Sequence, residues 1–188
     1  GPGDTVLVYG AGGVGLSAVM AARLSGAEQI IVCEPHHDKR EGAKTLGATH
    51  AVAPDDDVPG ILRSLTGGYG ADVTIDAVGA EGLLEQAFDA TTPGGTIVCV
   101  GLPSPSASTR VPAARFVREE KYLTGSLYGS SRPSIDIPHL LGLFAAGRLP
   151  IDRLITSTYR LDQLDDAFDD LEAGRLRRGV VLMDTTTD

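Results

Sequence analysis

The sequence predicts an α/β fold in which a doubly wound, six-stranded parallel sheet is flanked by helices and followed by a C-terminal segment of helix and strand. Short β-branched runs alternate with helical segments as far as Gly101, and this spacing is typical of βαβ units with right-handed crossovers. The chain has 24 glycines and no tryptophan, which suits many tight strand-to-helix turns better than a sandwich built on large rings. A glycine-rich stretch joins the first expected strand to the first expected helix.

Five strands are expected in the first part of the chain, each a short apolar run of the kind that is buried on both faces of a parallel sheet. They cover residues 5–9, 29–33, 50–52, 72–77 and 96–100. The helices between them are expected at residues 14–24, 38–46, 58–65 and 83–90. Gly26, Gly47 and Gly67 follow three of these helices and indicate where they end. The Pro-Gly-Gly stretch at residues 93–95 indicates a turn before the fifth strand.

The pattern changes after Gly101. Residues 102–111 are rich in proline and serine and lack a period, which indicates a loop. A sixth strand is expected at residues 122–128, and the Ser-Ser-Arg-Pro stretch that follows it indicates a boundary. Beyond that boundary the sequence predicts a helix, an extended run, a second helix, a final strand and a frayed tail, at residues 137–146, 154–161, 164–172, 179–183 and 185–188.

The composition narrows the class of protein. Hydrophobic residues make up 42% and charged residues 22% of the chain, as in ordinary soluble globular proteins. The formal net charge is −9 and no basic face is visible, which argues against a nucleic-acid partner. No apolar stretch is long enough to span a bilayer and no leader pattern is visible, so we expect a cytoplasmic protein without a membrane partner. Cys33 and Cys99 lie in apolar runs and are expected to be buried, reduced thiols.

The stretch Gly-Ala-Gly-Gly-Val-Gly, which begins at Gly10, carries the most specific chemical signal. It fits the pattern Gly-x-Gly-x-x-Gly between a strand and a helix, which is the context of a dinucleotide-binding Rossmann fold. Gly10 permits the tight turn, Gly12 lets the backbone approach a pyrophosphate because no Cβ intervenes, and Gly15 lets the helix pack on the strand. Gly13 and Val14 lie where the helix is expected to begin, and the free N–H groups of a helix start suit phosphate oxygens.

Glu34 is the second part of the same fingerprint. It follows the second expected strand and lies 19 residues beyond Gly15 (34 − 15), which is close to the separation of about 20 residues at which an acid binds the adenosine ribose. A carboxylate here accepts hydrogen bonds from the ribose hydroxyls and repels a 2′-phosphate, which favours NAD over NADP. Lys39 and Arg40 are close enough to leave that preference open, and Lys39 is a further candidate cofactor residue.

Two more segments are expected at the cofactor, because ligands of open α/β sheets lie beyond the carboxyl ends of the strands. Val78 follows the fourth strand and Gly101 follows the fifth. The sequence leaves open whether Asp76 contacts a cofactor, caps a helix or only ends its strand. No metal site is expected, because the adjacent residues His36 and His37 do not share a face and no further ligand lies near them in sequence; the three aspartates at residues 55–57 are typical of a solvated loop and helix start.

These residues together carry a resemblance. Nearly the whole chain, from Pro2 to about Met183, resembles the cofactor-binding domain and C-terminal segment of the zinc-type, medium-chain alcohol dehydrogenase family. The matching stretches are residues 2–8, 10–16, 44–49, 76–79 and 94–98. The zinc-free quinone reductase branch is less similar, because its phosphate loop usually reads Ala-x-x-Gly-Gly-Val-Gly, whereas Gly10 and Gly12 here give the alcohol dehydrogenase form.

The resemblance implies a Rossmann domain of residues 1–128 and a segment of residues 129–188 that packs against a catalytic domain. It implies that Arg178 meets the cofactor pyrophosphate, because a guanidinium fork suits two phosphate oxygens. It also implies that the strand at residues 121–128 pairs with a second copy of the chain, so we expect a homo-oligomer.

Other residues of the C-terminal segment have different expectations. Arg175 and Arg177 are expected to be solvated. The face around Leu140, Phe144 and Phe168, which would meet the catalytic domain, is expected to be exposed and apolar.

The family's catalytic zinc ligands and proton-relay groups lie upstream of Gly1, so the resemblance carries over no catalytic residue and no zinc ligand. It implies that the full-length parent transfers a hydride between an alcohol or aldehyde and NAD, with zinc polarising the oxygen. This chain alone is expected to be inactive. Two alternatives stay open: a stand-alone dinucleotide-binding or redox-sensing module, and a zinc-free quinone or enoyl reductase relative.

Overall fold

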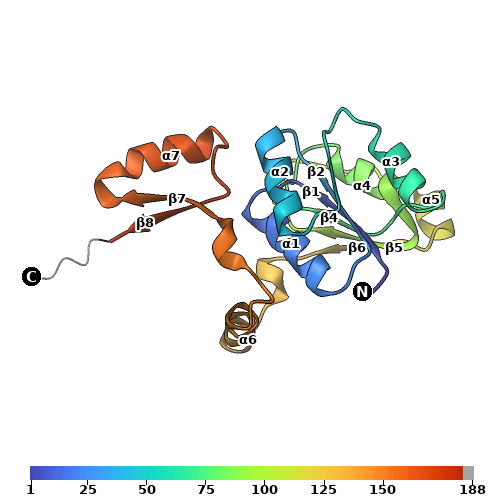
Figure 1. The fold of residues 1–188 in the computed structure, drawn as a ribbon. Helices are drawn as coiled ribbons and strands as arrows, with labels where there is room; N and C mark the ends of the chain where they lie inside the picture. Colours follow the sequence, from blue (N-terminus) through green and yellow to red (C-terminus); the bar gives the residue numbers. More distant parts are fainter. Residues whose placement is uncertain (184–188) are drawn as a thin grey trace, which may run out of the picture.

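The structure, a computed structural model that describes residues 1–183, confirms the predicted α/β architecture (Figure 1). Six parallel strands form one sheet in the order β3-β2-β1-β4-β5-β6. Their bounds are β1 Thr5–Tyr9, β2 Gln29–Cys33, β3 His50–Val52, β4 Ala71–Asp76, β5 Thr91–Cys99 and β6 Tyr122–Gly125. The strand order reverses between β1 and β4, and the ligand crevice of such a sheet lies beyond the carboxyl ends of the strands at this point.

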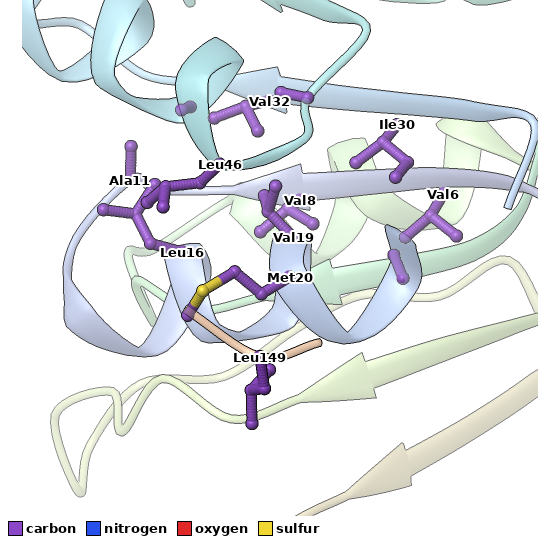
Figure 2. Close-up of a cluster of buried hydrophobic side chains, with 13 residues drawn as sticks. Val6, Val8, Ala11, Leu16, Val19, Met20, Ile30, Val32, Leu46 and Leu149 are labelled. Atoms are coloured by element: carbon purple, nitrogen blue, oxygen red, sulfur yellow. The ribbon is translucent and has the colours of Figure 1, made fainter. Parts of the chain in front are cut away.

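Helices cover both faces of the sheet (Figure 1). They are α1 Gly13–Leu24 and α2 His37–Leu46 on one face, and α3 Val58–Leu65, α4 Leu83–Ala90 and α5 Ala113–Arg118 on the other. Side chains alternate along β1, so that Val6 and Val8 belong to one buried cluster and Leu7 and Tyr9 to the other. Figure 2 shows the first cluster, in which Val19 of α1 packs near Val8.

The central position of β1 explains its sequence. All five of its residues are buried, and Leu7 pairs with Ile31 of β2 on one side and with Thr74 of β4 on the other. A strand with neighbours on both edges and helices on both faces has no solvent-facing side, so it is apolar throughout rather than alternating. Its end therefore brings Gly10 to the middle of the carboxyl edge of the sheet.

The last part of the C-terminal segment, residues 155–182, forms a smaller unit on the side of the sheet where α2 lies (Figure 1). Helix α6 Pro133–Ala145 leads through Leu149 to strand β7 Ile155–Arg160, helix α7 Leu164–Glu172 and strand β8 Arg178–Leu182. Strands β7 and β8 pair in parallel as a two-stranded sheet. Leu149 is buried in the cluster beneath α1, as Figure 2 shows. Among residues 1–183, no helix has both the length and the apolar character that a membrane span requires.

Three predicted elements have bounds that differ from the prediction by several residues. β5 already begins at Thr91 and runs through the expected turn at residues 93–95, because the pairing with β4 shifts register there and accommodates the extra residues as an irregularity. The sixth strand ends at Gly125 rather than residue 128, since the chain enters a short 3₁₀ turn in which Tyr128 has φ +50°. Helix α6 starts at Pro133 instead of residue 137, because proline is well suited to the first turn of a helix.

Candidate cofactor site

The loop between β1 and α1 is tightly folded on one side and open on the other. Gly10 has φ +92°, and a Cβ at Gly15 would lie 1.9 Å from the Gly10 carbonyl oxygen, so both positions require glycine for the turn and the close packing. At Gly12 the situation is reversed, because a Cβ there would meet no atom within 4 Å. The fold itself therefore does not explain Gly12, whereas a ligand lying close to this backbone would.

The start of α1 is available to an anion. Gly12 is the N-cap and supplies no side-chain hydrogen bond to the first turn. The first N–H groups of a helix have no partners within the helix and carry the positive end of its dipole. Val14, in that first turn, is half exposed. The open space above Gly12 thus lies next to backbone donors of the kind that bind phosphate groups.

Arg178 reaches this loop from the start of β8. Its Nη2 atom lies 3.1 Å from the position that a Cβ of Gly13 would take. The Arg178 side chain takes part in no ion pair within residues 1–183. The structure therefore places a guanidinium beside the helix start where the resemblance predicts a pyrophosphate.

Glu34 is buried at the end of β2, where the residue is only 5% exposed. Its Oε2 accepts a hydrogen bond from the Ala11 N–H at 2.8 Å, and its Oε1 accepts one from the His36 N–H at 3.0 Å. The carboxylate thus joins the glycine loop to the turn before α2, a role that the sequence motif alone did not indicate. Each carboxylate oxygen can accept more than one hydrogen bond, so the ribose role remains compatible with this bracing.

The two cations that left the cofactor preference open have different surroundings. Arg40 uses Nη1 to donate to the Glu34 and Pro35 carbonyl oxygens, both at 2.7 Å, so it clamps the backbone at the end of β2. Lys39 instead lines a cavity of about 510 Å³ between the start of α2 and the C-terminal segment. The cavity is lined by His36, His37, Asp38, Lys39, Thr156, Ala173, Gly174, Arg175 and Arg177.

Arg175 and Arg177 were both expected to be solvated, and this prediction is correct only for Arg175. Arg175 is exposed and pairs with Asp170 at 2.6 Å. Arg177, expected to be solvated, is only partly exposed. Its Nη1 lies 2.9 Å from the position that a Cβ of Gly42 in α2 would take. This contact joins segments far apart in the sequence, so no local pattern could indicate it.

The loops after β4 and β5 complete the carboxyl edge of the sheet. Val78 lies against the glycine loop, with its Cγ2 2.8 Å from the position of a Cβ on Gly10. Gly101 packs on the backbone of the Val78–Gly79 turn. Of the roles left open for Asp76, the structure favours one inside the protein, because its side chain is 4% exposed and accepts hydrogen bonds from the Val78 and Gly79 N–H groups.

A metal site needs several His, Cys, Asp or Glu side chains close together. Within the described part of the chain, no group of three or more His, Cys, Asp or Glu side chains is placed to hold a metal ion. Asp56 and Asp57 accept hydrogen bonds from the Ala53 and Gly60 N–H groups and shape the start of α3. Residues 1–183 therefore do not form a site for the zinc ion, whose ligands the resemblance assigns to another part of the full-length parent.

The two cysteines have unequal burial. Cys33 is buried, and burial together with the nearby Glu34 raises the pKa of its thiol to about 11. Cys99 is half-buried rather than buried as expected, and burial also raises the pKa of its thiol. Both are free thiols, and neither has the lowered pKa that an activated nucleophile requires.

The sheet order, the glycine loop and the acid at the end of β2 together define a Rossmann-type, NAD(P)-binding domain. The sequence profile of the zinc-binding dehydrogenases matches residues 13–146. The chain belongs to the zinc-binding dehydrogenase family and carries its cofactor-binding domain.

The curated relatives are alcohol dehydrogenases. The chain is 39% identical over 183 residues to a putative alcohol dehydrogenase D of Mycobacterium tuberculosis, covering 96% of this chain and 50% of that protein. It is also 39% identical over 183 residues to an NDMA-dependent alcohol dehydrogenase of Amycolatopsis methanolica, covering 96% and 49%. The chain thus spans about half the length of the curated relatives it matches.

Solved structures show the same fold. Benzyl alcohol dehydrogenase from Acinetobacter calcoaceticus superposes with a TM-score of 0.92 at 30% identity, over 97% of this chain and 50% of that chain. A putative zinc-binding dehydrogenase from Sinorhizobium meliloti 1021, bound to NADP, gives a TM-score of 0.80 at 28% identity, over 88% and 48%. An Escherichia coli CFT073 dehydrogenase complexed with NADH gives 0.81 at 26%, over 96% and 52%. Relatives therefore bind either cofactor.

Proposed function

We propose that this chain binds NAD(H) and serves as the cofactor-binding portion of a zinc-dependent alcohol dehydrogenase. The observation that carries the proposal is the convergence of Arg178, the open backbone at Gly12 and the uncapped start of α1. A guanidinium and free helix N–H groups facing one open space suit the two phosphates of a dinucleotide. The bound nicotinamide would supply the hydride acceptor or donor of the reaction.

The remaining candidate residues suit the adenosine ribose of a dinucleotide and the wall of its site beyond β4 and β5. Glu34 would accept hydrogen bonds from the adenosine ribose while keeping its bonds to Ala11 and His36. Its negative charge would oppose a 2′-phosphate, and Arg40 is bound to backbone carbonyls. Val78 and Gly101 would form the wall beyond β4 and β5. These features support NAD(H) over NADP(H), with Lys39 as the remaining cation that could offset the preference.

The same proposal assigns no catalytic group to this chain. The zinc ion and the groups that move the alcohol proton would come from residues outside those described, so we expect no alcohol oxidation by this chain alone. The exposed apolar side chains of Leu140, Phe144 and Phe168 would then pack against a catalytic domain. The division into residues 1–128 and residues 129–188 follows from this role.

We further infer that two copies pair along β6. This strand forms an edge of the sheet, and Tyr122 and Leu123 are exposed on it. An exposed edge with apolar side chains is normally covered, and a second copy can cover it by strand pairing. The mass of the chain in solution, measured by light scattering, tests this inference.

The binding proposal is tested by calorimetric titration with NADH and, separately, with NADPH. We expect saturable NADH binding and NADPH binding at least about tenfold weaker, because the proposal places the Glu34 charge next to the 2′ position of the adenosine ribose. Glu34→Gln should bring the NADH and NADPH affinities closer together, since it removes the negative charge while the side chain keeps nearly the same size. Glu41→Gln is the matched control, because it neutralises an exposed α2 carboxylate whose partner is Lys44. No binding of either cofactor would contradict the proposal, and stronger NADPH binding would overturn the NAD assignment.

A further inference from the structure

Asp76 is a buried carboxylate at the carboxyl end of β4. Its side chain is 4% exposed, and its Oδ1 accepts hydrogen bonds from both the Val78 N–H and the Gly79 N–H, each at 2.9 Å. A buried charge is costly unless hydrogen bonds compensate it, and bonds to an ionised acceptor are stronger than those between neutral groups. The carboxylate therefore fixes the direction in which the chain leaves β4.

The consequence of this turn is the position of Val78. The Val78 Cγ2 lies 2.8 Å from where a Cβ on Gly10 would be, so the side chain rests directly on the glycine loop. Val78 nevertheless remains half exposed, at 50% for the whole residue. One part of this side chain is thus held against Gly10 while the rest stands at the carboxyl edge of the sheet, where a dinucleotide would lie.

The loop after β5 supports the turn from the other side. The Asp76 carbonyl oxygen accepts hydrogen bonds from the Val100 and Gly101 N–H groups, each at 2.9 Å. A Cβ on Gly101 would lie 2.3 Å from the Gly79 nitrogen and 2.4 Å from the Val78 carbonyl carbon. The two loops are therefore in direct backbone contact, and the Asp76 backbone carbonyl joins them while its carboxylate shapes the turn on the β4 side.

We propose that Asp76 is a positioning residue for cofactor binding, whose carboxylate holds Val78 against Gly10 so that Val78 forms one wall of the dinucleotide site. This inference rests on the proposed function. Asp76 itself does not touch the cofactor, because its accepting oxygen is turned toward the backbone of its own loop and almost none of its side chain is exposed.

The test is a double-mutant cycle in NADH affinity with Asp76→Ala, Val78→Ala and the double variant. Asp76→Ala should weaken NADH binding by about tenfold, the size expected for losing hydrogen bonds to a charged acceptor. If Asp76 acts through Val78, the double variant should bind NADH no more weakly than Val78→Ala alone. If the double variant loses NADH affinity by the product of the two single-variant factors, Asp76 acts independently of Val78 and the proposal is overturned.

Two controls separate positioning from general stability. Asp76→Asn retains a side-chain oxygen that can accept both N–H bonds, so it should restore binding to within about threefold of the wild type. Asp57→Ala removes a similar carboxylate-to-backbone hydrogen bond at the start of α3. It should lower the melting temperature without changing NADH affinity.

The outcomes distinguish this inference from the proposed function. A wild-type chain that does not bind NADH overturns both, whereas normal NADH binding by Asp76→Ala overturns the positioning role alone. If Asp76→Ala does not fold, amide hydrogen exchange measured on the wild-type chain tests the positioning role instead. The Val78 and Gly79 amides should then exchange slowly in the free chain and more slowly with NADH. The proposal would be overturned if these two amides exchanged as fast as those of an unprotected loop, or if NADH left their exchange rates unchanged.

Discussion

The guanidinium of Arg178 lies beside Gly13, with Nη2 3.1 Å from the position a Cβ there would occupy. Gly13 begins α1 and Arg178 begins β8, so the contact joins the glycine loop to the C-terminal segment. A cation at this place lies beside the uncapped first turn of α1. Two sources of positive potential, one from a side chain and one from the helix, therefore converge on one space.

The first prediction is that Arg178→Ala weakens NADH binding by about tenfold to a hundredfold, because a charged hydrogen-bonding partner of the pyrophosphate is lost. Calorimetric titration at fixed ionic strength measures the change. Arg175→Ala is the matched control, since Arg175 pairs with Asp170 and its substitution should leave the affinity unchanged. Equal losses from both substitutions would indicate a general effect of charge rather than a contact.

The second prediction contrasts Gly12 with Gly15. Gly12 has φ −78° and ψ −173°, which alanine adopts without strain, and a Cβ there meets nothing within 4 Å. Gly12→Ala should therefore keep or slightly raise the melting temperature, yet weaken NADH binding at least about tenfold by filling the space next to the backbone. Gly15→Ala should unfold the chain at a lower temperature, because its Cβ would overlap the Gly10 carbonyl oxygen. Unchanged NADH affinity in Gly12→Ala would count against the proposed position of the pyrophosphate.

The third prediction concerns Lys121, whose side chain points inward at the start of β6. Its Nζ donates to the Phe88 carbonyl oxygen at 2.6 Å, pairs with Glu119 at 2.7 Å and lies 4.3 Å from the centre of the Phe88 ring. Lys121→Met should lower the free energy of unfolding by about 1–3 kcal/mol, because the buried Phe88 carbonyl oxygen loses its hydrogen-bond donor, whereas Glu119 keeps its pair with Arg115. Urea unfolding measures it. Lys44→Met, which removes an exposed pair with Glu41, should cost less than about 1 kcal/mol.

Local signals in the sequence predicted the elements that depend on local physics. The β1 strand and the glycine loop were predictable, because burial on both faces requires an unbroken apolar run and the turn requires Gly10. The expected turn at residues 93–95 lies inside β5, since the decisive factor is register against β4, which the sequence of β5 does not encode alone.

In the candidate site, too, the sequence indicated single residues but not the contacts between distant segments. Glu34 could be found from its spacing, but its hydrogen bonds to Ala11 and His36 required the three-dimensional arrangement. Arg177 gave no local signal for its place against Gly42. The Asp76 turn could have been anticipated, because aspartate often accepts hydrogen bonds from the backbone two residues ahead. Its effect on Val78 and Gly10 could not, since it depends on loops from different strands.

The last prediction uses the raised pKa of Cys33. In an unfolded chain this thiol ionises near its ordinary pKa of 9.0, whereas burial raises the pKa to about 11 in the folded chain. Between these values the folded state binds more protons than the unfolded state, so the free energy of unfolding falls as the pH rises from about 9 to about 11. Tyr9, whose pKa burial also raises, adds to the fall in the same direction. Urea unfolding across this pH range should show a shallower decline in Cys33→Ala than in the wild type, whereas Cys99→Ala, at the less buried thiol, should change the slope less. An identical decline in Cys33→Ala and the wild type would show that the Cys33 thiol does not contribute to the pH dependence.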